Sequence, residues 1–197
     1  MSIAPTRIAI LASGSGSNAE AILRHFEDSE TIDVAFVGCN RPESHAGIYE
    51  RTRQMGVETT RFNKAELLDG GLLQTLQSKG IDWVVLAGFL MHIPENLVRA
   101  YHGRMLNVHP SLLPKFGGKG MYGMHVHRAV LDANETESGM TVHWVTEAYD
   151  EGAVVFQAAC AVEPHDTPES LAERVMELEH TYYPQAIAAC IAEQKTA

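Results

Sequence analysis

The sequence has few of the features that mark export, membrane insertion or a metal scaffold. Its 197 residues include only three cysteines, Cys39, Cys160 and Cys190, which lie far apart and show neither CxxC nor Cys/His zinc spacing. No apolar run approaches the ~20 residues that span a bilayer. The short run Ile8–Ala12 is followed too soon by glycines for a secretory signal. We therefore expect a protein of the reducing cytoplasm that has no membrane partner.

Basic residues are also scarce. The chain has 15 lysines and arginines against 25 aspartates and glutamates, which gives a formal net charge of −10. Binding a nucleic acid over a broad area requires clustered cations, so we expect no nucleic-acid partner. A single small anion is still compatible with this charge, because one helix N-terminus can hold a phosphate whatever the overall charge.

The chain does contain a regular alternation of short apolar runs and longer segments with helical periodicity. Four runs predict buried strands, at Ile8–Ala12, Asp33–Gly38, Asp82–Ala87 and Met105–Val108. Three segments between them have apolar residues three or four apart and predict helices, at Asn18–Glu27, Ala46–Met55 and Lys64–Ser78. This alternation is typical of an α/β protein whose mostly parallel sheet is covered by helices on both faces.

The second half of the chain has a different pattern. Met140–Thr146 and Ala153–Val162 alternate like strands across a short connection and predict an antiparallel hairpin, so the sheet should be mixed. A last helix should begin at Thr167-Pro168, and Pro184 should end or kink it. Between these parts, Pro114–Gly123 has four glycines in ten residues and predicts a mobile loop, either a surface connection or a segment that gates a ligand.

A glycine-rich turn follows the first predicted strand. It reads Ser13-Gly-Ser-Gly-Ser-Asn18 and opens a helix, where unpaired backbone N–H groups favour an anion. The same residues satisfy the dinucleotide pattern G-x-G-x-x-G/A, but the acidic residue expected about 20 positions later is missing from Val37–Arg41. We therefore favour one terminal phosphate over a dinucleotide, with a purely structural turn as the alternative.

An amide and an imidazole follow an inner strand at Asn107-Val-His109, on the edge where open α/β sheets bind ligands. The amide can stabilise an oxyanion and the imidazole can move protons near neutral pH. Asp150, in the turn of the predicted hairpin, is the candidate partner of His109, and an Asx turn is its structural alternative. His125-Val-His127 lacks the cysteine or carboxylate cluster of a metal site, so we expect no metal.

Together these motifs resemble those of the folate-dependent formyltransferases. The matching segments are Ser13–Asn18, Leu86–Phe89, Asn107–Lys115, Val142-His143 and Asp150–Gly152, and the similarity runs from about residue 7 to Ala192. The resemblance implies a Rossmann-like formyltransferase fold in a single domain over 1–197. Residues 1–100 would form a phosphate-binding βαβ half, and residues 101–197 a catalytic and folate-binding half.

The resemblance also implies an activity and its residues. The activity is transfer of a formyl group from the co-substrate 10-formyltetrahydrofolate to the amine of glycinamide ribonucleotide in purine synthesis, by a monomer or homodimer. The catalytic residues would be Asn107, His109 and Asp150. The phosphate would bind Gly16, Ser17 and Asn18, and the ribose would bind Glu179. The folate would bind Lys64, Phe89, Leu90, Met91, His92, Ile93 and Asn107, with His125 and His143 as additional contacts.

The implied chemistry assigns a task to each catalytic residue. Asn107 and a protonated His109 would stabilise the oxyanion formed when the amine attacks the formyl carbon. Asp150 would keep His109 cationic and relay a proton, through water, to the departing folate nitrogen.

Two features depart from the family pattern. The segment Phe89–Ile93 lacks the arginine of some relatives, and Lys64 is the nearest substitute for a second folate arginine. The glycine-rich loop Phe116–Gly123 is longer than in many relatives. Other formyl folate-dependent formyltransferases, a formyltetrahydrofolate deformylase, a nicotinamide-dependent oxidoreductase and a non-catalytic phosphate-binding module are the alternatives.

Overall fold

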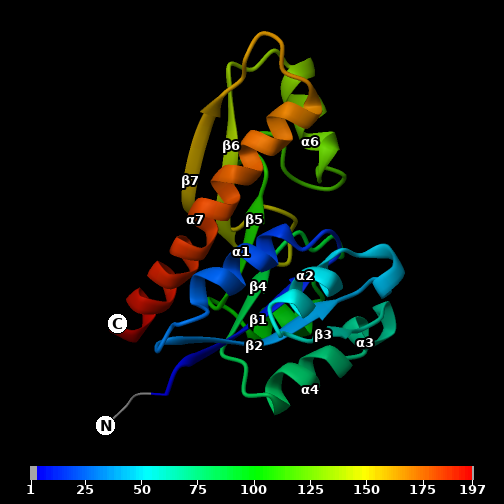
Figure 1. The fold of residues 1–197 in the computed structure, drawn as a ribbon, viewed down its shortest axis with the longest axis vertical. Coiled ribbons are helices and arrows are strands. Elements are labelled where there is room, and N and C mark those ends of the chain that lie inside the picture. Colours follow the sequence, from blue (N-terminus) through cyan, green and yellow to red (C-terminus); the bar gives the residue numbers. More distant parts are fainter. Residues whose placement is uncertain (1–3, 197) are drawn as a thin grey trace.

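The computed structural model describes residues 4–196, whose strands form one seven-stranded sheet in the order β3-β2-β1-β4-β5-β6-β7 (Figure 1). The strands are β1 (Thr6–Ala12), β2 (Ile32–Cys39), β3 (Thr59–Arg61), β4 (Trp83–Leu86), β5 (Met105–His109), β6 (Glu137–Trp144) and β7 (Val154–Ala161). The pairs from β3 to β5 are parallel, and β6 pairs antiparallel with both β5 and β7. The mixed, mostly parallel sheet and its antiparallel hairpin are confirmed.

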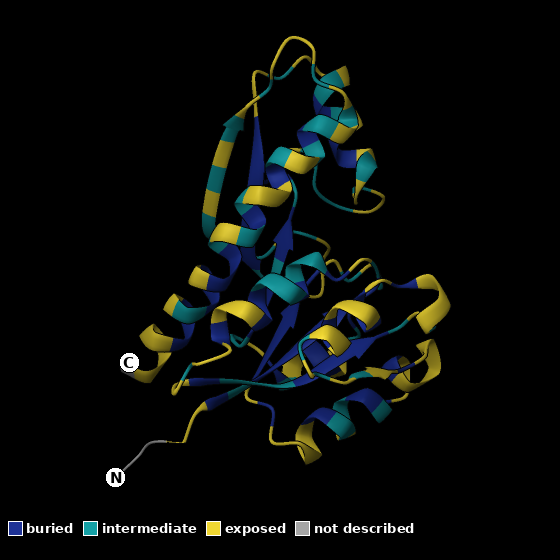
Figure 2. Cartoon of the chain, viewed as in Figure 1, coloured by how far each residue is buried: buried dark blue, intermediate teal, exposed yellow. Residues whose placement is uncertain are grey.

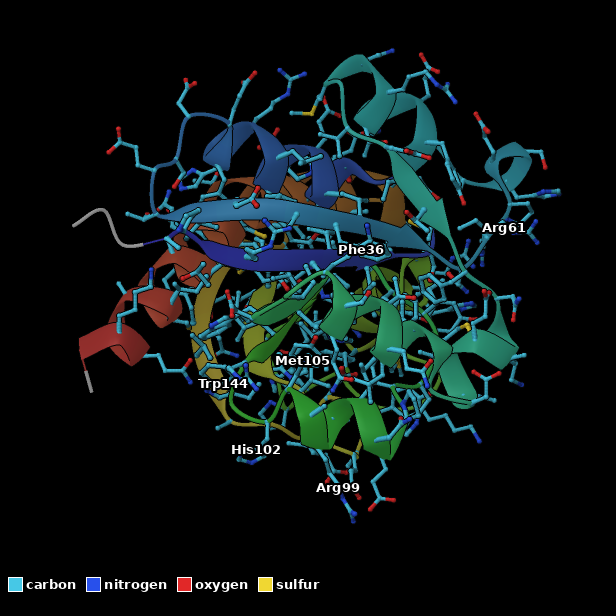
Figure 3. The ribbon with its side chains drawn as sticks, turned by 90° about the horizontal axis from the view of Figure 1, so that it is seen from below. Phe36, Arg61, Arg99, His102, Met105 and Trp144 are labelled. Carbon is cyan, nitrogen blue, oxygen red and sulfur yellow. The ribbon has the colours of Figure 1, made fainter. Side chains whose placement is uncertain are left out.

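Helices cover both faces of this sheet. They are α1 (Ser17–Phe26), η1 (Glu43–His45), α2 (Ile48–Gln54), α3 (Lys64–Leu68), α4 (Gly71–Ser78), α5 (Glu95–Ala100), α6 (Met124–Asp132) and α7 (Pro168–Thr196). Figure 3 looks across the layers and shows α1 on one side of the sheet and α5 on the other. Phe36 and Met105, both labelled there, belong to the core beneath α3, α4 and α5.

The two cores follow from the period-two alternation of the strands. In β1, Ile8 and Ile10 lie in the core under α1, α2 and α7, whereas Ala9 and Leu11 lie in the core under α3, α4 and α5. Successive side chains of a strand point to opposite faces, so a strand covered on both sides needs apolar residues throughout. This is why the predicted strands read as continuous apolar runs.

The last helix runs along both parts of the sheet (Figure 1). Its contacts include α1, α6, β5, β6 and β7. Pro184 does not end it, because Pro184 lies inside a helix that continues to Thr196. Tyr183 and Ile187 on either side of the proline are fully buried, and this packing offsets the backbone hydrogen bond that proline removes.

Four local expectations about the elements were wrong or incomplete. The single helix predicted over Lys64–Ser78 is two helices, because Gly70 adopts a left-handed conformation, with φ of 91°, between them. The short elements β3 and α5 were not predicted. The helix α6, which contains His125-Val-His127, was not predicted either.

Candidate active site

A cavity of about 720 Å³ opens beside the point where the strand order changes direction, between β1 and β4. Ligands of open α/β proteins bind at such a point, outside the carboxyl ends of the strands. Of the residues predicted from the sequence, those that line the cavity are Ser17, Asn18, Phe89, Leu90, Met91, His92, Ile93, Asn107, His109, His143, Asp150 and Glu179. Segments far apart in the chain therefore meet at one site.

The glycine turn forms one end of this cavity. Gly16 caps α1 in the left-handed conformation, with φ of 79°, and a Cβ there would come within 2.6 Å of Ile48. Only glycine allows both the conformation and this close approach. The turn is tied to the end of β4, because the Ser13 hydroxyl accepts a hydrogen bond from the Leu90 N–H at 2.9 Å. The N-terminus of α1 therefore faces the cavity with backbone N–H groups that have no acceptor within the helix.

A buried carboxyl lies next to that helix N-terminus. Asn18 Nδ2 donates a hydrogen bond to Glu179 Oε2 at 2.6 Å, and Glu179 is 8% exposed. Burial raises the pKa of Glu179 to about 7, and the hydrogen bond from Asn18 opposes this rise only partly. Among the described residues, the buried Asn18 Oδ1 has no hydrogen-bond partner. This corner of the cavity therefore combines a helix end with unsatisfied hydrogen-bonding capacity.

Asn107 and His143 are cross-strand neighbours on β5 and β6. Asn107 Nδ2 lies 3.0 Å from His143 Nε2, and His143 Nδ1 lies 2.9 Å from the carbonyl oxygen of Trp144. Residues directly opposite each other in an antiparallel pair have side chains on the same face. The amide and the ring therefore form a single hydrogen-bonded unit on the wall of the cavity.

Asp150 lies between two histidine rings. Its Oδ2 is 3.4 Å from His109 Nδ1 and its Oδ1 is 3.5 Å from His143 Nε2. The turn that carries Asp150 holds it in the left-handed conformation, with φ of 55°. An Asx turn alone, the structural alternative, would not require this convergence of Asp150 with two buried rings.

The pKa values of this pair move in the same direction for different reasons. Burial lowers the pKa of His109, and the charge of Asp150 and the Phe116 carbonyl oppose this without cancelling it. Burial by itself raises the pKa of Asp150, but the His143 contact, the charge of His109 and the Gly118 N–H together hold it below its usual value. In this conformation the surroundings therefore favour an ionised Asp150, while burial works against the cationic form of His109 that the resemblance implies.

The base of the glycine-rich loop contacts both members of the pair. His109 Nε2 lies 2.8 Å from the carbonyl oxygen of Phe116, and the Gly118 N–H donates to Asp150 Oδ2 at 2.9 Å. Phe116 adopts a left-handed conformation, with φ of 54°, that is uncommon for a residue with a bulky side chain. Backbone groups of this loop are thus hydrogen-bonded to side-chain atoms of His109 and Asp150 that a ligand would otherwise contact.

The segment after β4 forms the apolar wall. Phe89–Ile93 lines the cavity, and His92 reaches across to the β6–β7 connection, where its Nε2 lies 2.9 Å from the Glu147 carbonyl oxygen. The rings of His92 and Tyr149 also meet edge to face, with centroids 4.7 Å apart. Exposed aromatic and apolar groups at this mouth suit a planar ring system.

Three predicted residues are absent from the cavity lining, and one lining histidine was missed. Gly16 shapes the turn without lining the cavity, while Lys64 and His125 are exposed elsewhere. His127, which was judged only as part of a metal motif, lines the cavity and is buried, and its Nδ1 has no hydrogen-bond partner among the described residues. The helical spacing of Val126 and Val130 was the signal that could have identified α6.

The histidines, cysteines, aspartates and glutamates of residues 4–196 form no group of three or more that could hold a metal ion. None of the helices in this part of the chain is long and apolar enough to cross a membrane.

Comparisons with known proteins show the family to which the chain belongs. The model of the formyl transferase family matches residues 6–187. Phosphoribosylglycinamide formyltransferase, chloroplastic, from Arabidopsis thaliana is 40% identical over 193 residues, which cover 95% of this chain but only 66% of that protein. Phosphoribosylglycinamide formyltransferase from Bacillus subtilis is 34% identical over 92% of each chain. The crystal structure of glycinamide ribonucleotide transformylase 1 from Symbiobacterium toebii is similar with a TM-score of 0.84 and 37% identity, covering 93% of this chain and 86% of that one.

Proposed function

This chain belongs to the formyl transferase family, and from that premise we propose that it transfers the formyl group of 10-formyltetrahydrofolate to the amine of glycinamide ribonucleotide. The relatives named for this reaction support the assignment. The observation that carries it is the meeting of Asn107, His109 and Asp150 in one cavity with the N-terminus of α1. The reaction belongs to purine biosynthesis, and its product is formylglycinamide ribonucleotide.

We propose that the ribonucleotide binds at the glycine-turn end of the cavity. Its phosphate accepts hydrogen bonds from the N–H groups at the start of α1, where Gly16, Ser17 and Asn18 lie. Its ribose hydroxyls contact Glu179, which lines the cavity beside Asn18. The substrate amine then points toward Asn107 and His109.

The folate is proposed to bind along the apolar wall formed by Phe89, Leu90, Met91, His92 and Ile93. Lys64 and His125 lie outside the cavity lining, so contacts from them are not part of this proposal. The donor's formyl carbon must reach Asn107, which belongs to both subsites. This arrangement places an amine nucleophile and a formyl electrophile at the same polar corner.

The proposed chemistry is an acyl transfer without oxidation or reduction. The amine nitrogen forms a bond to the formyl carbon, and the electron pair of the carbonyl π bond moves to oxygen. Collapse of this adduct breaks the bond from carbon to the folate nitrogen, which gains a proton as the attacking nitrogen loses one. An N–H of Asn107 stabilises the oxyanion, and Asp150 accepts and relays the proton with His109.

The lowered pKa of His109 fits the same scheme. Negative charge that develops on the substrate oxygen favours the cationic form of a nearby imidazole, and the proton that the attacking amine loses supplies it before it passes to the departing folate nitrogen. The Phe116 carbonyl now accepts from His109 Nε2, so a substrate oxygen has to replace that carbonyl to receive the same hydrogen bond. Binding and movement of the loop base are thereby coupled.

A spectrophotometric assay with glycinamide ribonucleotide and a 10-formyl folate tests substrate, donor and reaction together. We expect saturable turnover that requires both compounds. A nicotinamide-dependent oxidoreductase would instead bind NAD(P)H and fail to turn over. Binding of both substrates without formyl transfer would favour a non-catalytic module.

The cytoplasmic location, the single-domain division at residue 100, the monomeric or dimeric state and the absence of a nucleic-acid partner stay predictions. The Arabidopsis relative carries the word chloroplastic in its name, so location varies among relatives. The proposed reaction requires no metal, because each charge that develops has a protein group to stabilise it.

A further inference from the structure

His143 is a fully enclosed ring with a defined partner on each side. It is 2% exposed, and its two ring nitrogens contact the Trp144 carbonyl oxygen and the Asn107 amide. Trp144 is labelled in Figure 3, close to Met105 at the start of the neighbouring strand. The charged groups that face the ring are Asp150, at 3.5 Å, and His109.

The hydrogen-bond partners of His143 determine where its proton lies. A carbonyl oxygen can only accept, so Nδ1, at 2.9 Å from the Trp144 oxygen, must carry a proton. The group of Asn107 that lies 3.0 Å from Nε2 is its NH₂, which can only donate, so Nε2 must be the acceptor. The two contacts together place the single ring proton on Nδ1. The contact with Asp150 would lower the pKa of that carboxyl as a hydrogen bond only if Nε2 carried a proton. At 3.5 Å it lies at the outer limit of a hydrogen bond, and the Asn107 NH₂ at 3.0 Å from the same nitrogen argues against that proton.

A glycine keeps the Trp144 carbonyl available to the ring. A Cβ on Gly152 would lie 1.7 Å from that carbonyl oxygen, so any other residue would displace it. The segment from Asp150 to Gly152 thus serves both rings. Asp150 contacts His109, and Gly152 leaves space for the acceptor that sets the tautomer of His143.

We propose that His143 is a positioning residue for the formyl transfer reaction. As the neutral tautomer with its proton on Nδ1, it holds the Asn107 amide so that one N–H binds the ring and the other N–H points at the formyl oxygen. Without this contact the amide is free to rotate, and its oxygen would then face the developing oxyanion and repel it. The inference rests on the proposed function, because it assigns Asn107 the role of oxyanion donor.

Kinetics of matched variants test the role. Loss of one oxyanion donor typically costs about 10²–10³ in kcat, so we expect a loss of about 100-fold in His143→Leu, with the KM for the ribonucleotide changed less than about twofold. His143→Gln, whose side-chain oxygen can accept from Asn107, should recover at least about tenfold of that loss. His102→Leu, on an exposed turn labelled in Figure 3, is the matched control and should retain wild-type kcat.

Nitrogen NMR of the wild-type protein tests the tautomer without relying on activity. Long-range ¹H–¹⁵N spectra of ¹⁵N-histidine-labelled protein should show His143 with a protonated Nδ1 and a bare Nε2, assigned by loss of its signals in His143→Gln. A ring protonated on Nε2 would overturn the inference, as would a His143→Leu enzyme that keeps kcat within threefold of an active wild type. If the wild type transfers no formyl group, the proposed function fails, while the NMR result still decides how Asn107 is held.

Discussion

The parallel and antiparallel parts of the sheet contribute different chemical groups to the same cavity, backbone groups from the first and side chains from the second. The parallel strand β1 is apolar on both faces and contributes a glycine turn and a helix N-terminus, which are backbone groups. The strand β5, where the parallel part meets the antiparallel part, contributes the side chains of Asn107 and His109, and the antiparallel strand β6 and the turn after it contribute those of His143 and Asp150. Figure 2 shows the contrast, with the central parallel strands buried and β7 alternating between exposed and intermediate residues.

This difference shows which part of the sheet can present backbone groups to a ligand and which part can present polar side chains. A strand covered on both faces has no free side to present polar groups, so its contribution comes from the loop at its carboxyl end. In β5 and β6, by contrast, one face carries apolar core residues and the opposite, equally buried face carries polar residues such as His109, Thr141 and His143. We therefore expect changes in the parallel part to alter binding and stability, and changes in the antiparallel part to alter turnover.

The largest effect should come from Asp150→Asn. Removing the proton-handling carboxylate should lower kcat by about 10³–10⁴ with little change in the KM for the ribonucleotide, as general acid–base catalysis contributes on that scale. Asparagine tolerates the left-handed backbone of position 150, so folding should not suffer. Steady-state formyl transfer measures both constants, and Asp132→Asn on exposed α6 is the control. A kcat within threefold of wild type would contradict the view that the antiparallel part of the sheet determines turnover.

The next effect is on stability and concerns Glu179. Its pKa rises from 4.5 to about 7 in the folded protein, so the folded state binds protons more tightly than the unfolded state. The contribution of Glu179 to the unfolding free energy is therefore fully present below about pH 4.5 and is lost as pH rises through 7, by about 3 kcal/mol in total. Glu179→Gln keeps an oxygen for Asn18 and has no charge to bury, so at pH 8 it should be more stable than wild type by about that amount.

Urea unfolding at pH 5, 6, 7 and 8 measures the effect, with the exposed Glu177→Gln on the same helix as control. Parallel pH profiles for wild type and Glu179→Gln would show that Glu179 titrates normally. Glu179 would then no longer count as a buried carboxyl at the end of the cavity that is proposed to bind the ribonucleotide.

A smaller effect is expected from glycine substitutions in the turn after β1. Gly16→Ala should destabilise the protein by about 2 kcal/mol and raise the KM for the ribonucleotide about tenfold, because Gly16 has φ of 79° and no space for a Cβ. Gly14→Ala is the matched control, since no atom lies within 4 Å of its Cβ position. Thermal unfolding and KM measure both. Equal behaviour of the two variants would contradict the assignment of the close approach at Ile48.

The smallest effect should come from Asn18→Ala. It removes the amide that donates to Glu179, which is worth about 1–2 kcal/mol for a hydrogen bond to a buried partner. We expect the KM for the ribonucleotide to rise about tenfold with kcat unchanged. A fall in kcat at constant KM would place Asn18 with the catalytic side chains instead, and an unchanged KM would remove it from the phosphate site.

Much of the fold was predictable because it depends on local patterns. The buried strands gave continuous apolar runs, and the β6–β7 hairpin gave alternation on both sides of a short connection. Two of the elements that were missed, β3 (Thr59–Arg61) and α5 (Glu95–Ala100), are short and offer too few residues to establish a period. Gly70 splits a helical pattern that is otherwise continuous, because it adopts a left-handed conformation between α3 and α4.

The site was predictable only where residues follow a strand directly. Asn107 and His109 stand two apart at the end of β5, so their position at the sheet edge follows from the strand itself. The contacts of His109 with the Phe116 carbonyl and of Asp150 with the Gly118 N–H are backbone contacts from a loop, which no residue type encodes. The lowered pKa of His109 is likewise set by burial, which depends on the whole fold.

The long last helix also has a consequence for how the chain acquires its structure during synthesis. Leu171, Val175 and Ile187 of α7 complete the same core as Ile8 and Ile10 of β1. A chain leaves the ribosome N-terminus first, and contacts between residues far apart in sequence form late. One apolar side of β1 therefore stays exposed until α7 has been synthesised. We expect nascent chains that stop before residue 168 to bind chaperones more strongly than full-length chains do.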